Sequence, residues 1–202
     1  MSATRTAPTS TASSRPGRHR SQAADTAILE AALEVLADEG YAGLTMAAVI
    51  ERAGVSSATL YRRWPTKQQL VVAAVETLVP APSDTDTGSL AGDLDAFARD
   101  VAASIAVHHE DIAQTLNRER RRNPELAAAL RERFRDPRLR ELRGMLTRAK
   151  ERGELGTAPS PEVVLSLVAG PIYHRAFYLG EPITQAFVRT TVDHTVRALS
   201  SA

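Results

Sequence analysis

Apolar residues recur three and four positions apart along most of the chain, and no segment shows the alternating pattern of a β-strand. The first long repeat predicts a helix over residues 22–39, with Gly40 ending it. Its buried stripe consists of Ile28, Ala32, Val35 and Leu36. The sequence therefore predicts an all-α fold.

Two short helices joined by a tight turn follow over residues 45–67. Thr45 can cap the first helix and Ser56 the second, because a side-chain hydroxyl accepts a backbone N–H that the first turn leaves unpaired. Gly54 stands between them, where a left-handed backbone ends the first helix. Apolar residues four apart give each helix one buried face, so the two faces are expected to pack together.

The rest of the chain is also predicted to be helical. Thr66 caps a fourth helix after Pro65, and residues 80–89 form a linker, marked by a break in composition. Pro124, Pro137 and Pro161 suit first-turn positions, where a missing N–H costs nothing. The expected helices are residues 90–108, 111–122, 125–135, 137–152, 161–179 and 183–200.

Composition narrows the possible functions. The chain has 202 residues, of which 43% are hydrophobic, enough for a sizeable core, and no cysteine, which excludes disulfides and thiolate zinc sites. The longest apolar run, residues 163–173, is too short to span a bilayer, and the amino terminus lacks the apolar core of a secretory signal. We expect a cytoplasmic protein that uses no membrane, metal or cofactor.

Residues 1–21 carry arginines but no acid and little apolar surface, so we expect a disordered basic arm. Arg18 and Arg20 resemble the short basic arms that enter the DNA minor groove. A solvated tail without specific contacts is the alternative.

The second short helix presents a small, basic outer face. Ser57, Ala58, Tyr61 and Arg62 point outward, and no acidic residue occurs between Glu51 and Glu76. A short helix of this kind, presented by a partner helix, fits the DNA major groove.

Residues 27–78 also closely resemble the TetR family of bacterial transcription regulators. The matching segments are AALEVLADEGY, LTM, ERAGVS and ATLYRRWPTK. The resemblance implies a helix-turn-helix DNA-binding head with its linking helix over residues 22–79, and a helical ligand-binding and dimerisation body over residues 90–202. Positions that hold phosphates in the family are Thr45, Tyr61 and Lys67; those that face base edges are Ser57, Ala58, Thr59 and Arg63, flanked by Ser56 and Arg62.

Three residues depart from the family pattern. Asp25 stands where relatives often have an arginine, which removes one expected phosphate contact. Ile50 replaces a small residue and should alter helix packing. Ser57 replaces a common lysine, so a second non-specific phosphate contact is lost.

The resemblance further implies a two-fold homodimer built from the last two helices. The dimer residues we expect are Val164, Leu167, Val168, Ile172, Phe187, Val188 and Val192; a wholly internal core is the alternative. The body should also hold a small-molecule effector, in a cavity that Ile105, Leu116, Phe134, Leu142, Tyr173 and Phe177 could line. A plain core is the alternative here as well.

These observations favour a bacterial transcriptional repressor, associated with the nucleoid, that binds palindromic DNA and is released by an effector. An effector-independent activator or an architectural DNA-binding protein is the alternative. An enzyme is not expected, because the sequence offers no nucleophile–base pair, phosphate loop or metal spacing. The arginine-rich run at residues 118–152 fits a solvated face, a second nucleic-acid surface, an anionic-ligand site, or pairing with the acidic residues 84–111.

Overall fold

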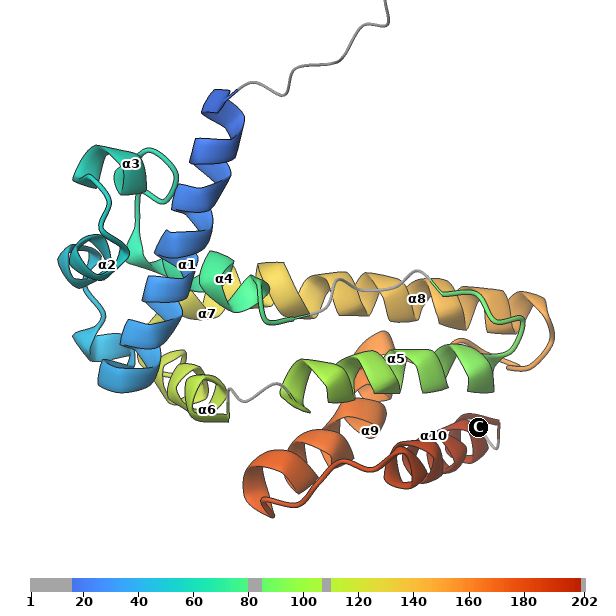
Figure 1. Cartoon of the computed structure of the whole chain (residues 1–202). Coiled ribbons are helices and arrows are strands. Elements are labelled where there is room, and N and C mark those ends of the chain that lie inside the picture. The colour runs from blue at the N-terminus through green and yellow to red at the C-terminus, as the bar shows by residue number, and fades with distance from the viewer. Residues whose placement is uncertain (1–15, 80–84, 107–109, 201–202) are drawn as a thin grey trace, which may run out of the picture.

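The computed structural model describes residues 16–79, 85–106 and 110–200, and these are helical, with no strand among them (Figure 1). The all-α prediction is confirmed. Within these ranges no helix is both long enough and apolar enough to cross a bilayer.

Helix α1 (Pro16–Gly43) begins earlier than predicted, so residues 16–21, which we expected in a disordered arm, are helical. Residues 1–15 of the expected arm lie outside the described part of the chain. Gly40 interrupts α1 with a φ of 70°, a left-handed conformation that glycine adopts without a Cβ clash, and one more turn follows to Gly43. The predicted break at Gly40 is therefore confirmed.

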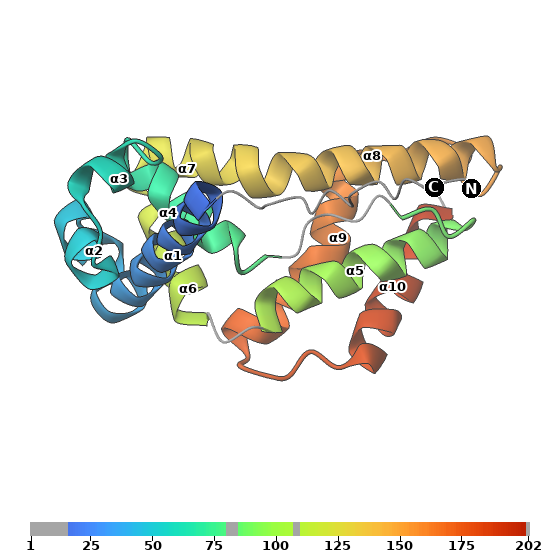
Figure 2. The same ribbon diagram turned by 45° about the horizontal axis from the view of Figure 1, so that its top comes forward.

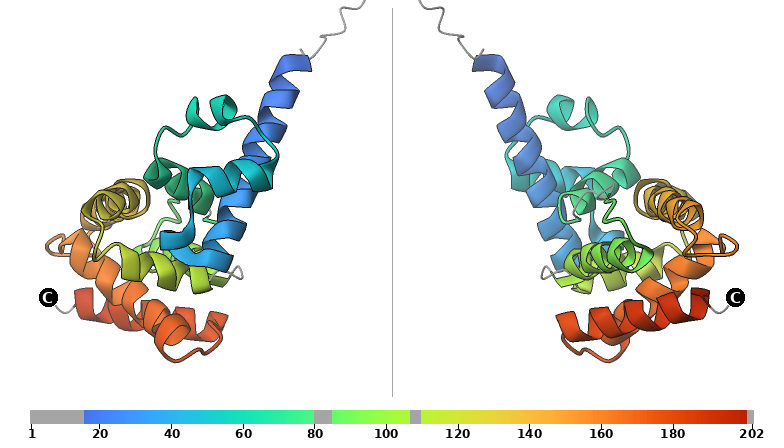
Figure 3. Two further views of the ribbon diagram at one scale, coloured as in Figure 1. Left: turned by 90° about the vertical axis from the view of Figure 1, so that its left-hand side faces the viewer. Right: turned by 90° about the vertical axis from the view of Figure 1, so that its right-hand side faces the viewer.

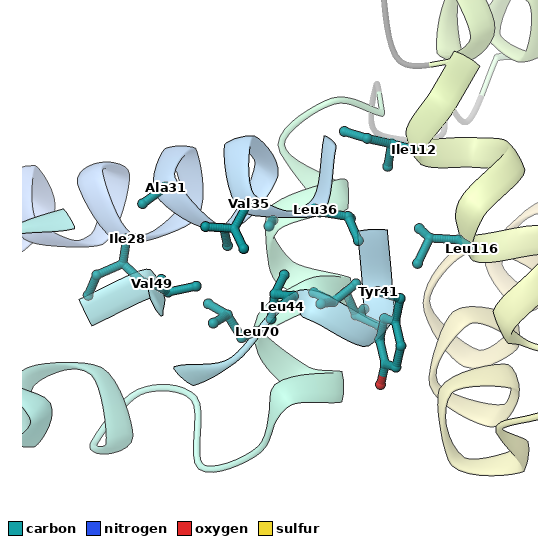
Figure 4. Close-up of a cluster of buried hydrophobic side chains, with 14 of the residues drawn as sticks. Ile28, Ala31, Val35, Leu36, Tyr41, Leu44, Val49, Leu70, Ile112 and Leu116 are labelled. Atoms are coloured by element: carbon teal, nitrogen blue, oxygen red, sulfur yellow. The ribbon is translucent and has the colours of Figure 1, made fainter. Parts of the chain in front are cut away.

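Three shorter helices complete the head: α2 (Met46–Ala53), α3 (Ser57–Tyr61) and α4 (Lys67–Glu76). α1 packs against α2 and α4, and their apolar faces form one core (Figure 4). Its fully buried side chains include Ile28, Val35, Leu36, Leu44, Val49, Leu60 and Leu70. The predicted stripe of α1 is confirmed, since all four of its residues belong to this core.

The head core extends into helices that follow the linker in sequence. α6 (Glu110–Glu119) packs against α1, and α7 (Pro124–Leu130) packs against α4. Ile112 and Leu116 of α6 reach toward Leu36 and Tyr41 (Figure 4), and Leu126 of α7 is buried in the same cluster. Two helices of the predicted body therefore complete the hydrophobic core of the head.

α7 continues through a π-helical turn, η1 (Arg131–Arg135), into α8 (Asp136–Glu151), and the three form one long rod (Figure 2). In the π turn the backbone N–H of Asp136 donates to the carbonyl of Arg131, five residues back. The widened turn accommodates Pro137, which has no N–H of its own. Pro137 was predicted to start a separate helix, but it lies within a continuous one.

The second core lies at the other end of the molecule, away from α3 (Figure 3). It is built from α5 (Leu90–Ala106), α8, α9 (Pro161–Tyr173) and α10 (Gln185–Ser200), with a second π turn, η2 (His174–Tyr178), directly after α9. Phe97, Leu142, Met145, Val164 and Ile172 are fully buried there.

Asp93 of α5 is fully buried and organises the end of this core. Its Oδ1 accepts hydrogen bonds from the backbone N–H of Thr87 (2.7 Å) and from the Thr87 hydroxyl (2.8 Å). Its Oδ2 lies 3.5 Å from the Arg148 guanidinium and 3.6 Å from that of Arg152. At these two arginines, the predicted pairing of the arginine-rich run with the acidic residues is confirmed.

We expect Asp93→Asn to lower the free energy of unfolding by about 1.5–3 kcal/mol, because hydrogen bonds to a buried charged group contribute that much. Urea unfolding followed by circular dichroism measures the loss. Asp95→Asn is the matched control on the same helix: its surface pair with Arg99 (2.9 Å) should contribute only about 0.3–0.5 kcal/mol. Equal losses in the two variants would contradict a special role for Asp93.

Candidate DNA-binding surface

The turn between α2 and α3 is defined by local hydrogen bonds. Thr45 Oγ1 accepts the N–H of Ala48 at 3.1 Å and so caps α2. Gly54 has a φ of 64°, and its N–H and that of Val55 donate to the last carbonyls of α2, each at 3.3 Å. Ser56 Oγ accepts the N–H of Thr59 at 3.3 Å and caps α3. The predicted caps and turn glycine are therefore confirmed.

The outer face of α3 is exposed to solvent as predicted. Ser57, Ala58 and Arg62 are exposed, and Tyr61 keeps 49% of its surface accessible. Leu60 points the other way and is fully buried in the head core. A short helix with one side buried and a small, basic, hydroxyl-bearing side exposed can enter a major groove.

The hydroxyls at the start of α3 are partly committed within the helix. Ser56 Oγ and Thr59 Oγ1 lie 2.8 Å apart and share a hydrogen bond, and Thr59 is only partly exposed. A base contact through the Thr59 hydroxyl would have to replace that bond. Ser57 and Ala58 are therefore better placed to face base edges.

The Arg63 side chain does not extend into solvent beside the exposed outer face of α3. Its guanidinium forms an ion pair with Asp25 of α1, and only 20% of its side chain is accessible. In the structure Arg63 ties the end of α3 to α1, a role that sequence reasoning missed when it assigned Arg63 to a base edge. The signal was present: Asp25 is one of the departures from the family pattern, and an unexpected acid is a candidate partner for a nearby arginine.

Lys67, a predicted phosphate contact, is the first residue of α4, the last helix of the head. Its Nζ lies 4.2 Å from the centre of the Tyr41 ring, a cation–π distance. Burial lowers the pKa of Lys67, and the negative charge of Glu119 opposes that shift. Thr66 Oγ1 accepts the N–H of Gln69 at 3.2 Å, so the predicted cap of α4 is confirmed.

Arg18 and Arg20, the predicted minor-groove residues, lie in the first turns of α1. Their side chains are outside the described part of the structure, so this contact stays a prediction.

The six predicted pocket residues are divided between the two cores. Leu116 and Phe134 pack in the head core, and Ile105 and Leu142 in the second core. Tyr173 stacks on Phe177 with ring centres 5.8 Å apart. The six do not form one cluster, and the cavity they were expected to line stays a prediction.

Five of the seven predicted dimer residues are buried within the protomer. Val164, Val168, Ile172, Val188 and Val192 are inside the second core. They cannot provide an interface surface, and this part of the prediction is wrong: helices that are apolar on more than one face do not reveal which face meets a neighbour. Leu167, at 39% exposed, and the partly buried Phe187 remain accessible.

Those two residues line a shallow groove between α9 and α10, with a volume of about 430 Å³. Its other lining residues are Pro171, Thr190, Thr191, His194, Thr195 and Ala198. Val163 and Tyr173 of α9 are exposed large side chains. The described surface of α9 and α10 therefore presents apolar and small polar groups rather than charges along this groove.

Two family models together match most of the chain. The model described as "Bacterial regulatory proteins, tetR family" matches residues 28–74, and the one described as "Tetracyclin repressor-like, C-terminal domain" matches residues 84–195. The first spans the second half of α1, all of α2 and α3, and most of α4, and the second spans the helices from α5 through most of α10.

Curated relatives align over nearly their whole length. The HTH-type transcriptional regulator YdeS of Bacillus subtilis is 29% identical over 192 residues, covering 93% of this chain and 96% of the relative. An HTH-type transcriptional regulator of Mycobacterium tuberculosis is 33% identical over 173 residues, 85% of each chain. The DNA-binding transcriptional repressor TetR of Mycobacteroides abscessus is 30% identical over 182 residues, 89% of this chain and 95% of the relative.

Solved structures share the fold. The TetR family transcription regulator SCO0332 is 29% identical, with a TM-score of 0.58 over 86% of this chain and 97% of the other. The flavonoid-responsive regulator FrrA is 23% identical, with a TM-score of 0.66 over 88% of this chain and 95% of the other.

We expect Asp25→Asn to free the Arg63 guanidinium for a DNA phosphate. The slope of log affinity against log salt should become more negative by about 0.9 per protomer, because each added phosphate contact releases counterions. Fluorescence anisotropy with a labelled duplex over a range of salt concentrations measures the slope.

The double variant Asp25→Asn, Arg63→Ala is the control and should lose that gain. An unchanged slope in Asp25→Asn would show that Arg63 cannot reach DNA and serves only to join α3 to α1. Thermal unfolding of the same variants reports the stability of the pair, which should be about 0.2–1 kcal/mol because both side chains are partly exposed.

Proposed function

The chain belongs to the TetR family of helix-turn-helix transcriptional regulators, and from that premise we propose that it represses transcription as a homodimer bound to a palindromic operator. The observation that carries the proposal is the exposed face of α3, on which Ser57, Ala58, Tyr61 and Arg62 stand and to which α3 contributes no acidic residue. Its M. abscessus relative is a DNA-binding repressor, which favours repression over activation.

The contacts divide into those that position the protein and those that read bases. Thr45 and Tyr61 carry hydroxyls for phosphate oxygens, and Lys67 supplies a cation. Ser57 and Ala58 face the groove floor, where a hydroxyl can donate or accept and a methyl suits a thymine methyl. Arg62, exposed beside them, is the arginine available for guanine, in place of the tethered Arg63.

A second copy of the chain would double these few contacts. The groove between α9 and α10, together with the exposed Val163, Leu167 and Tyr173, supports a dimer through these helices. A two-fold dimer would place its two α3 helices in successive turns of the major groove, ~34–36 Å apart.

Release by a small molecule is supported by the contacts between head and body. Asn123, which caps α7, donates to the Tyr41 hydroxyl at 3.3 Å, and Gln68 of α4 donates to Glu125 at 3.2 Å. Glu76 of α4 also forms an ion pair with Arg133 in η1. A ligand that favours another arrangement of the body would change these contacts and, through them, the spacing of the two heads.

We expect the protein to prefer palindromic DNA from its own promoter region, and Tyr61→Phe to weaken that binding for all sequences alike. One hydrogen bond to a charged phosphate is worth about 1.5–3 kcal/mol per protomer. The salt slope should stay unchanged, because the lost group is neutral. Anisotropy titrations measure both quantities.

Tyr178→Phe is the matched control, because Tyr178 is the most exposed tyrosine of the described residues and lies in η2, outside the α2–α3 pair. It should bind DNA like the wild type. A protein without preference for any palindrome from its own promoter region would overturn the proposed function.

We expect Leu167→Arg to convert the dimer into a folded monomer, because a guanidinium in the centre of an apolar interface loses its hydration without gaining a partner. Light scattering after size-exclusion chromatography measures the mass, and circular dichroism checks the helical content. Operator affinity should fall with the mass, since a monomer engages one half-site. A variant that stays dimeric would place the interface elsewhere.

A further inference from the structure

Arg138 is the one buried cation among the described residues. Only 8% of its surface is exposed, and the other buried polar residues are Asp93, Thr191 and Thr195. Arg138 lies in the first turn of α8, directly after the π turn η1, and faces α5. A buried charge is expensive unless it is paired, so its contacts require explanation.

Those contacts satisfy the guanidinium only in part. Nη2 donates to the Ser104 hydroxyl at 3.0 Å, and Ser104 in turn donates to the carbonyl of Asp100 at 2.7 Å. The guanidinium carbon lies 5.5 Å from the centre of the Phe97 ring. Nη1 is buried without a hydrogen-bond partner among the described residues.

No carboxylate of the described residues lies within ion-pair distance of Arg138, although other arginines of the same helix have such partners. Arg148 and Arg152 both pair with Asp86 and Asp93. Glu141, one turn further along α8, is engaged in an interaction of its own. Arg138 therefore differs from Arg148 and Arg152 in that no carboxylate of the described residues pairs with its guanidinium.

One aromatic side chain and one π turn adjoin the guanidinium. The Phe97 ring is the aromatic group that lies against it. The π turn η1 directly precedes α8, in whose first turn Arg138 lies, and such turns are frequent at functional sites.

We propose that Arg138 binds the anionic group of the effector, and that the effector is a small carboxylic acid with an apolar or aromatic body. The inference rests on the proposed function, in that it names the ligand class to which the regulator responds. A carboxylate would take Nη1 and neutralise the charge, while the Phe97 ring would contact the apolar part. The charge of a single buried cation balances that of a monoanion, whereas a phosphate dianion would need a second cation.

The experiment uses the full-length protein and a panel of octanoate, phenylbutyrate and benzoate, each paired with its neutral alcohol. Isothermal titration calorimetry and thermal unfolding measure binding. We expect at least one carboxylate to bind at millimolar concentration and raise the melting temperature, and its alcohol to bind roughly tenfold or more weakly.

Arg138→Met should abolish the difference between acid and alcohol, and should leave the melting temperature of the free protein unchanged or higher, because an unpaired buried charge has been removed. Arg140→Met is the matched control: it removes the same charge from an exposed position two residues away and should retain carboxylate binding. Arg138→Lys should restore part of the preference for the acid.

Two results would overturn the inference. One is equal carboxylate binding by wild type and Arg138→Met, which would place the anion elsewhere. The other is that the wild type binds no carboxylate of the panel and that Arg138→Met is less stable than the wild type. Arg138 would then be a structural residue. Operator binding by the wild type is measured in parallel. If the wild type does not bind operator DNA, the proposed function is contradicted. If it binds operator DNA but no carboxylate, only the present inference is contradicted.

Discussion

The arrangement of the whole molecule depends on the burial of Ile112, Leu116 and Leu126 in the core of the head. The head helices leave an apolar surface around Leu36 and Tyr41, and α6 and α7 cover it. Because α7 runs through η1 into α8, the helix that completes the head core also contributes to the second core. The head is therefore not an independent unit joined by a linker alone: moving α8 relative to α4 would disturb the head's own packing.

Polar contacts at the same junction connect the DNA-facing side to the body. Tyr41 is shared: its hydroxyl accepts from the cap residue of α7, Asn123, and its ring lies under the ammonium group of Lys67. A shift of α7 would move the ring, and with it the cation that is expected to meet a phosphate. Interior cores are close-packed and transmit such shifts rather than absorb them.

The features that the sequence predicts well are local. Caps at Thr45, Ser56 and Thr66, and the left-handed glycine at position 54, follow from hydrogen bonds within a few residues, and all four are present. The pair between Arg63 and Asp25 spans two helices, so no local pattern contains it. The same limit applies to Val164 and Val188: periodicity shows that a helix has an apolar face, but only the packed fold shows whether that face meets its own chain or another.

The two buried charges at opposite ends of the α5–α8 contact differ in a way that separates stability from function. Asp93 is met by two hydrogen bonds from Thr87 and by two guanidiniums, so its burial holds the linker, α5 and α8 together. Arg138 has one hydroxyl and one aromatic ring, which leave its charge without a counterion in the described structure. An arginine at such a position gains little for the free protein, because an apolar side chain of similar size would pack there at no electrostatic cost. Its presence is explained if the missing anion arrives with a ligand. That ligand would bind about one turn along the rod from Arg133, whose ion pair with Glu76 joins the rod to the head.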